Sequence, residues 1–168
     1  MRAGGATHSG QDAADQWRIA SVGESDSAVL ASIHRTAFPD AWDAATLGTF
    51  VAQPGGFALL ARDRSGVAGG FLLARAVAGE SEVLTLAVRP ECRRTGCGMG
   101  LLTHALVVAA AVGTQRMVLE VSADNGAAQA LYLRAGFEII GRRAGYYRSG
   151  AGLPVDALLL AVRWQTAQ

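Results

Sequence analysis

The sequence predicts an α/β or α+β protein built on one mixed β-sheet. Short apolar runs of strand character cluster in the middle of the chain. Over residues 82–121, a strand, a glycine-rich turn, a long apolar helix and a second strand follow one another, which indicates a βαβ unit with two parallel strands. No internal repeat occurs. We therefore expect one sheet of about seven strands flanked by about four helices, in a single domain over residues 17–168.

Composition indicates a compact protein. Of 168 residues, 51% are hydrophobic and 17% charged, which excludes a disordered chain. The net charge of +1 gives no general attraction to nucleic acid or anionic membranes, so we expect neither as a direct partner. Residues 1–16 are rich in Gly, Ala, Ser and Asp without an apolar core, which predicts a flexible tail and not a signal peptide. We expect a cytoplasmic protein.

The first quarter of the chain predicts a strand and two helices. Residues 17–22 have strand character and end at a glycine. Residues 25–27 offer N-cap side chains for a helix that carries apolar residues at helical spacing over 29–34. The Phe-Pro-Asp-Ala-Trp segment at 38–42 breaks this helix, and a second short helix is expected over 43–53.

The middle of the chain predicts three consecutive strands. Residues 57–61 and 67–76 flank the polar turn 63–66, which favours a β-hairpin. A third strand is expected over 82–88, and Pro90 ends it because proline cannot donate to a β-ladder.

The βαβ unit continues into the C-terminal part. The helix expected over 98–112 is apolar around most of its circumference, which predicts deep packing, with His104 on its less buried side. A buried strand follows over 117–121, and then a helix over 125–134 that Gly136 closes in the left-handed conformation.

Two final strands are expected over 137–141 and 157–164. The residues between them, 142–156, include three glycines, two tyrosines and a proline, and this composition predicts a loop.

The glycine-rich turn is typical of a pyrophosphate-binding loop. Glycines at 96, 98 and 100 tolerate positive φ and lack bulk, the following helix directs free N–H groups at an anion, and Arg93 and Arg94 add charge. No lysine follows the glycines, which excludes a P-loop, and their spacing differs from the Rossmann Gly-x-Gly-x-x-Gly.

The pattern that fits is Arg-x-x-Gly-x-Gly, preceded by Leu-Ala-Val-Arg-Pro at 86–90. It resembles the acetyl-CoA-binding motif of the GCN5-related N-acetyltransferases (GNAT). Acetyl-CoA is therefore the expected cosubstrate, with its pantetheine along the main chain of the strand before the loop. The candidate cofactor-binding residues are Leu86, Ala87, Val88, Arg93, Arg94, Thr95, Gly96, Cys97, Gly98, Met99, Asn125 and Tyr132.

Acyl transfer to an amine needs a base, a stabilised oxyanion and a proton for the leaving thiolate. No Ser-His-Asp or Cys-His pattern is present, which favours direct transfer over a covalent intermediate. Glu120 stands within an apolar strand, where burial would raise its pKa towards that of a useful base, although strand alternation could instead direct it to solvent. Tyr132 is either a proton donor or a packed helix residue, and Asn125 is either an N-cap or a ligand contact.

The segments at 119–125, 130–137 and 145–147 are similar to those of bacterial ribosomal-protein-alanine N-acetyltransferases, a GNAT subfamily. This resemblance implies that Glu120 is a general base acting through water, that Tyr132 is the general acid, and that Asn125 contacts the cofactor. It also implies an acceptor cleft shaped by the 38–42 segment and by the tyrosine pair. The candidate substrate-binding residues are Phe38, Trp42, Tyr146 and Tyr147.

The expected acceptor is a protein N-terminus. Model α-amino groups titrate about 2.5 units below lysine, so a modest base suits them better. An N-terminal alanine of a small-subunit ribosomal protein is implied by the resemblance alone. A small-molecule amine, a lysine side chain and a non-catalytic acyl-CoA-binding role remain alternatives. Two cysteines, Cys92 and Cys97, and three scattered histidines predict no metal site. We expect a monomer or a weak dimer.

Overall fold

The computed structural model describes residues 16–164, so the tail expected over 1–16 lies outside the described residues except for Gln16. Within them, the element order matches the prediction, with a 3-10 helix added before α2 (η1) and before α4 (η2). The strands are β1 (Arg18–Val22), β2 (Gly56–Arg62), β3 (Ala68–Val77), β4 (Glu80–Val88), β5 (Arg116–Ser122), β6 (Glu138–Arg148) and β7 (Pro154–Arg163). The helices are η1 (Glu24–Asp26), α2 (Ser27–Ala37), α3 (Ala44–Ala52), η2 (Pro90–Cys92), α4 (Cys97–Ala111) and α5 (Gly126–Arg134).

One mixed sheet contains all seven described strands, in the order β1-β2-β3-β4-β5-β7-β6. Only the β4–β5 pair is parallel, and α4 connects its two strands. The predicted fold class is therefore confirmed, including the βαβ unit around the glycine-rich loop.

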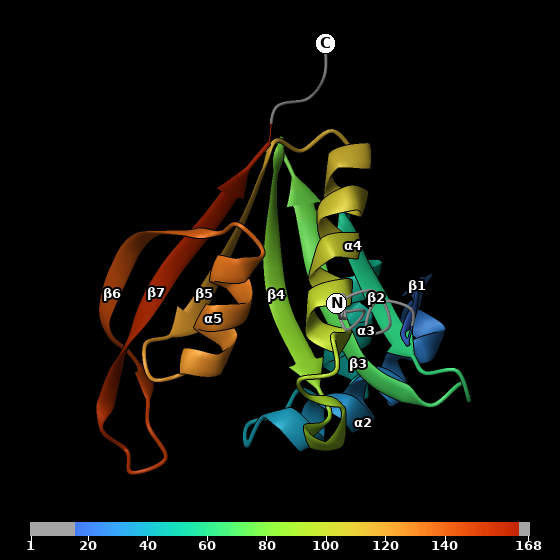
Figure 1. Cartoon of the computed structure of the whole chain (residues 1–168), viewed down its shortest axis with the longest axis horizontal. Coiled ribbons are helices and arrows are strands. Elements are labelled where there is room, and N and C mark those ends of the chain that lie inside the picture. The colour runs from blue at the N-terminus through green and yellow to red at the C-terminus, as the bar shows by residue number, and fades with distance from the viewer. Residues whose placement is uncertain (1–15, 165–168) are drawn as a thin grey trace, which may run out of the picture.

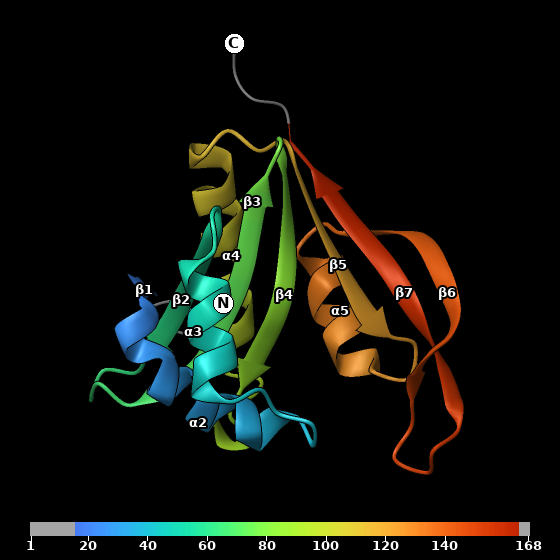
Figure 2. The same cartoon turned by 180° about the vertical axis from the view of Figure 1, so that it is seen from behind.

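Helices cover both faces of this sheet. Helices α4 and α5 lie on the face seen in Figure 1, and α2 and α3 lie on the opposite face seen in Figure 2. Each face buries its own apolar cluster: Leu72, Leu101 and Met117 belong to the cluster under α4, and Leu30 and Phe71 to the cluster under α2. Burying such side chains on both faces is what stabilises a three-layer arrangement.

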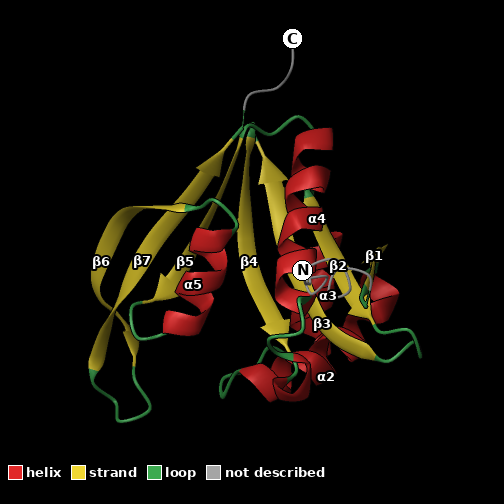
Figure 3. Cartoon of the chain, viewed as in Figure 1, coloured by secondary structure: helices red, strands yellow, loops and turns green. Residues whose placement is uncertain are grey.

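The parallel strands β4 and β5 separate along their length. Their recorded pairing ends after three residue pairs, from Glu80 opposite Arg116 to Glu82 opposite Val118. Beyond this point the strands diverge, as Figure 3 shows. We call this divergence, between residues 83–88 of β4 and 119–122 of β5, the fork. It leaves one edge of β4 without a neighbouring strand in the middle of the sheet.

The loop expected over residues 142–156 is wrong. Strand β6 continues to Arg148 and β7 begins at Pro154, so only residues 149–153 connect them. Gly145 and the two tyrosines, which were among the residues that indicated a loop, lie in an irregular edge strand whose register shifts between Arg143 and Tyr147. Gly145 has φ +61° within this irregularity.

Helix α4 is packed along one stripe instead of all round. Leu101, Leu102 and Ala105 are fully buried against the sheet, whereas Val107 is 64% exposed and His104 is exposed as predicted. The expected deep burial therefore applies to one side of the helix. The N-terminus of α2 also differs from the prediction. The Asp26 side chain accepts a hydrogen bond from the Gly23 N–H and none from an amide of the helix.

Candidate functional site

The glycine-rich loop turns sharply between β4 and α4. Its left-handed residues are Arg94 (φ 61°) and Gly96 (φ 86°), and Gly96 is the N-cap of α4. Of the three glycines only Gly96 has a positive φ, and Gly98 and Gly100 are helical, in agreement with the helix expected over 98–112. Their missing side chains instead make room for neighbours: a Cβ would lie 3.1 Å from Leu131 Cδ2 at Gly98 and 2.8 Å from Ile19 Cδ1 at Gly100.

The N-terminus of α4 has free amide groups. The first bond into the helix runs from the Gly100 N–H to the Gly96 carbonyl at 2.9 Å, so the amides of Cys97, Gly98 and Met99 precede the helical ladder. They add to the positive end of the helix dipole, and the exposed Arg93 and Arg94 precede them. This combination of donors and positive charge suits a phosphate group.

The indole of Trp17 holds this loop in place by hydrogen bonds. Its indole Nε1–H donates to the Thr95 carbonyl at 3.2 Å and to Thr95 Oγ1 at 3.1 Å, and Thr95 Oγ1 donates to the Cys92 carbonyl at 2.6 Å. Gly69 leaves the space for the indole, because a Cβ there would lie 2.3 Å from the ring. Sequence reasoning assigned Trp17 only to a strand, and no local pattern links it to a loop 78 residues away.

The free edge of β4 faces the fork. The Arg89 N–H donates to the carbonyl of Gly69, near the start of β3, at 2.8 Å, so by alternation the main chain of Ala87 also faces β3. The main-chain groups of Leu86 and Val88 therefore point away from β3, and the Val88 carbonyl already accepts a bond from Arg93 Nε at 3.3 Å. This is the geometry that an extended ligand needs in order to pair with a strand edge.

Glu120 lies on the other side of the fork, on β5. Its neighbours Leu119 and Val121 are buried in the cluster under α4, so Glu120 projects to the opposite face, the face that carries α2 and α3. Its side chain is 26% exposed and accepts a bond from Arg143 Nη1 at 2.7 Å. The carboxyl is thus neither buried, as its apolar neighbours suggested, nor directed fully to solvent: strand alternation turns it away from the cluster under α4, and it is partly exposed.

Arg143 was missed by sequence reasoning, which placed it in a loop. In the structure it belongs to β6 and lies over the Tyr146 ring, with 4.1 Å from Cζ to the ring centroid. The hydrogen bond to Glu120 raises the pKa of Arg143, so the guanidinium is permanently charged. Recognising 138–148 as one strand would have placed Arg143 beside the fork.

Tyr132 is buried on α5, with its ring 5.9 Å from that of Phe137. Burial, followed by the charge of Tyr147, raises the pKa of Tyr132 to about 12, so the phenol keeps its proton at neutral pH. Burial, followed by the charge of Glu120, also raises the pKa of Tyr147. Tyr147 is therefore electrostatically coupled to both predicted catalytic residues.

The tyrosine pair and the 38–42 segment come from opposite ends of the chain. Tyr146 and Tyr147 meet edge to face at 5.1 Å, and Tyr146 is 51% exposed. Phe38 and Trp42 stack around His34, with ring centroids 4.5 and 5.3 Å from the imidazole. Strand alternation puts Glu120 on the sheet face that α2 and α3 cover (Figure 2), and Trp42 packs against the apolar cluster on that face.

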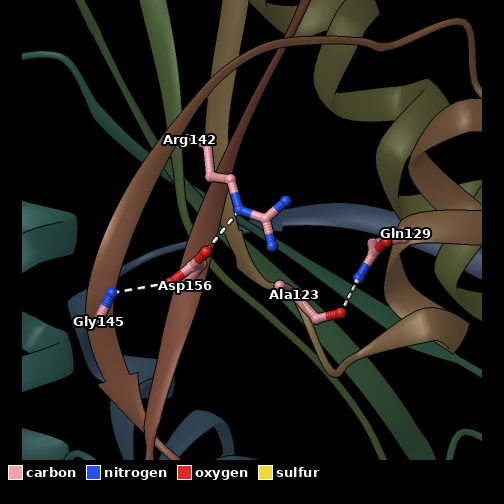
Figure 4. A network of polar contacts seen from close by, with 5 residues as sticks. All are labelled: Ala123, Gln129, Arg142, Gly145 and Asp156. Carbon is pink, nitrogen blue, oxygen red and sulfur yellow. Dashed lines mark hydrogen bonds and ion pairs between the residues drawn. The ribbon is translucent and has the colours of Figure 1, made fainter.

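A polar network fixes the β6–β7 hairpin (Figure 4). Asp156 accepts bonds from Arg142 Nε and from the Gly145 N–H, the latter at 2.9 Å. These two donors lower the pKa of Asp156, the Gly145 amide being the larger cause. Close by, Gln129 Nε2 donates to the Ala123 carbonyl at 3.0 Å and ties α5 to the end of β5.

Asn125 caps helix α5, and the two cysteines are protonated thiols. Asn125 Oδ1 accepts a bond from the Ala128 N–H at 3.1 Å, which confirms its N-cap role, and its cofactor contact stays a prediction. Burial raises the pKa of Cys97 to about 12 and also raises that of Cys92, so both are protonated thiols at neutral pH. Within residues 16–164, no three potential ligand side chains gather into a metal site, and no helix is long and apolar enough to span a membrane.

Comparison with known proteins agrees with this geometry. The sequence model of the Acetyltransferase (GNAT) family matches residues 28–137. The [ribosomal protein bS18]-alanine N-acetyltransferase of Escherichia coli strain K12 is 33% identical over 99 residues, which cover 59% of this chain and 66% of that protein. The crystal structure of the E. coli ribosomal-protein-S18-alanine N-acetyltransferase superposes with a TM-score of 0.82 at 26% identity, covering 90% of this chain and 96% of the other.

A further sequence relative and a further structure are also similar to this chain. The mycothiol acetyltransferase of Clavibacter michiganensis subsp. michiganensis is 43% identical over 79 residues, covering 47% of this chain and 26% of that protein. The chain thus spans about a quarter of one curated relative and just under two thirds of the other. Arabidopsis thaliana NAA60 in complex with acetyl-CoA has the same fold, with a TM-score of 0.76 at 21% identity, covering 88% of this chain and 98% of that one.

Proposed function

Because this chain belongs to the GNAT acetyltransferase family, we propose that it transfers the acetyl group of acetyl-CoA to a protein N-terminal α-amino group. The acceptor that we favour is the N-terminal alanine of a small-subunit ribosomal protein, on the similarity to the bacterial bS18-alanine N-acetyltransferases. Residues 17–168 would act as one catalytic domain. The observation that supports this proposal most strongly is the fork. The amides of Cys97–Met99 lie near one end of it, and Glu120 lies on its far side.

Cofactor binding is assigned to the loop amides, to two exposed arginines and to the main chain of β4. The loop amides and Arg93 and Arg94 would bind the diphosphate, since they combine N–H donors with positive charge. The main chain of Leu86 and Val88 would pair with the pantetheine amides along the free edge of β4. When bound, acetyl-CoA supplies an activated thioester carbonyl.

Acetyl transfer by this chain would be direct. Glu120, acting through water, would remove a proton from the acceptor amine on the α2–α3 face, and Arg143 holds that carboxylate in position. Tyr132 would give its proton to the leaving thiolate, which suits a phenol that stays protonated at neutral pH. Cys97 would not serve as a nucleophile, because its thiol is buried and protonated.

A peptide panel tests the acceptor. Acetyl-CoA and the purified protein are incubated with an Ala-initiated peptide, with the same peptide blocked at its α-amine but carrying a lysine, and with small-molecule amines. We expect the first peptide to gain one acetyl group by mass spectrometry. Transfer to the lysine peptide alone would contradict an N-terminal acceptor.

In cells, N-terminal proteomics of a strain lacking this gene should show one or few unacetylated N-termini.

Acetylation of a small-molecule amine is the second candidate. It is supported by the 43% identity to mycothiol acetyltransferase over 79 residues. Transfer to small amines in preference to every peptide would establish this alternative. Binding of acetyl-CoA without transfer to any amine would instead support a non-catalytic acyl-CoA-binding role.

A further inference from the structure

His34 is buried at the junction between the acceptor side and the cofactor side of the site. It lies in the last turn of α2 and is 3% exposed. Its Nδ1 accepts a bond from the Trp42 N–H at 3.0 Å, and its Nε2 lies 3.1 Å from Thr85 Oγ1 on β4. One imidazole thus joins the 38–42 segment to the strand whose next residue, Leu86, faces the fork.

These partners determine the tautomer. A backbone N–H can only donate, so Nδ1 must present its lone pair to Trp42. Nε2 then carries the proton of the neutral ring and donates it to Thr85 Oγ1. Burial lowers the pKa of His34, which agrees with a neutral ring. Both ring nitrogens are therefore used, each in a fixed direction.

The same side chain holds the 38–42 segment by stacking. The Trp42 ring lies nearly parallel to the imidazole, at an interplanar angle of 17°, and in turn contacts Phe50 of α3 at 5.0 Å. In the described part of the chain, the hydrogen bonds recorded for the backbone of 38–42 both go to His34, from Phe38 N–H to its carbonyl and from Trp42 N–H to Nδ1. Of these two bonds, the one from Trp42 N–H depends on the His34 side chain, whereas any residue at position 34 would offer the carbonyl that accepts from Phe38.

We propose that His34, as the neutral Nε2–H tautomer, is the positioning residue that sets the 38–42 segment against β4 and so determines how the acceptor is held. This role rests on the proposed function, because it assumes that Phe38 and Trp42 border the acceptor. An apolar residue of the same size would fill the space but leave the partly buried Trp42 amide without this acceptor and Thr85 without this donor.

Three variants separate the two bonds. His34→Leu removes both, His34→Asn keeps a side-chain oxygen near the position of Nδ1, and Thr85→Val removes only the Nε2 partner. We expect His34→Leu to raise the KM of the acceptor peptide about tenfold and to leave the Kd of coenzyme A within about twofold. His34→Asn should recover most of this loss. His104→Asn, on the exposed side of α4, is the matched control and should change neither quantity.

Two measurements do not depend on activity. Nitrogen-15 NMR of the wild-type imidazole should show a protonated Nε2 and an unprotonated Nδ1. Hydrogen exchange at the Trp42 amide should speed up in His34→Leu and stay slow in His34→Asn. A proton on Nδ1, or an unchanged acceptor KM in folded His34→Leu, would overturn the role of His34. Parallel losses in acceptor KM and coenzyme A affinity would also overturn it, since they would indicate general destabilisation.

The inference and the proposed function fail separately. If the wild-type protein acetylates no peptide N-terminus, the proposed function fails and the acceptor role of His34 with it. In that case the NMR and exchange results still decide whether His34 holds the 38–42 segment. If the wild-type protein is active and the His34 variants match it, only the inference fails.

Discussion

The two sides of the fork differ in the kind of group that they present to a ligand. On the cofactor side, β4 and residues 89–99, the functional groups are main-chain amides and carbonyls, held over a buried core by Trp17. On the hairpin side, Glu120 with β6 and β7, they are side chains held by ion pairs, Glu120 on the inner strand β5 and Arg143 on the largely exposed edge strand β6. Backbone groups can bind the same ligand in many relatives, whereas exposed side chains can change with the acceptor. We therefore expect variants on the cofactor side to change the affinity for coenzyme A, and variants on the hairpin side to change turnover.

Glu120→Gln is expected to give the largest effect. Loss of the general base should lower kcat by about 10²–10⁴-fold, with the Kd of coenzyme A unchanged because Glu120 lies across the fork from the loop. Steady-state kinetics and calorimetry measure the two quantities. Glu138→Gln, on the exposed edge strand β6, makes the same change of charge away from the fork and is the control. A weaker affinity for coenzyme A in Glu120→Gln would break the division between the two sides.

Tyr132→Phe should lower kcat by about 10²-fold, since the leaving thiolate loses its proton donor. Because the pKa of Tyr132 is raised to about 12, the wild-type rate should show no titration of this phenol near the ordinary tyrosine value of 10.0. A pH–rate profile tests this point. A Phe variant with wild-type kcat would remove Tyr132 from the mechanism and leave it as a packed residue beside Phe137.

Gly96→Ala should weaken coenzyme A binding about tenfold without lowering kcat at saturation. A Cβ at φ 86° strains the left-handed conformation that sets the direction of the loop amides. Gly66→Ala is a strict control, because Gly66 has φ 87° but lies in the β2–β3 turn. Both variants should lose similar stability, and only Gly96→Ala should lose affinity. Equal affinities would mean that the loop conformation does not govern binding.

Asp156→Asn should have the smallest effect and a dependence on pH. The pKa of Asp156 is lowered in the folded protein, so its carboxylate stabilises the hairpin at pH values above its ordinary 3.8 and loses this contribution as the pH falls through the lowered value. Wild type should therefore be slightly more stable than the variant at neutral pH and equal to it in strong acid. Denaturant unfolding at several pH values measures this difference, and a constant difference would contradict the linkage.

The cofactor side could be predicted from sequence because its determinants are local. The glycine at 96, the preceding arginines and the following apolar helix all stand within a few residues, and backbone geometry follows from them. Gly98 and Gly100 show the limit of this reasoning. Their small size is required by Leu131 and Ile19, which are distant in sequence, and no local pattern distinguishes that need from a positive φ.

The hairpin side could not be predicted as well because its determinants are non-local. The pairing of β6 with β7 offsets the turn-like composition of 142–148, and it brings Arg143 to Glu120 across 23 residues of sequence. His34 was likewise assigned only to an apolar helix face, because its partners Trp42 and Thr85 meet it through tertiary packing. Glu120 and Tyr132 were identified through family resemblance, and neither residue's neighbours in sequence specify its role.

The most direct test of the account is a calorimetric titration of the folded protein with coenzyme A and, separately, with acetylpantetheine, which lacks the diphosphate. The loop amides after Arg93 predict one-to-one binding of coenzyme A and far weaker binding of acetylpantetheine. No heat with coenzyme A, or equal affinity for the two ligands, would contradict the assignment of the α4 N-terminus to the diphosphate.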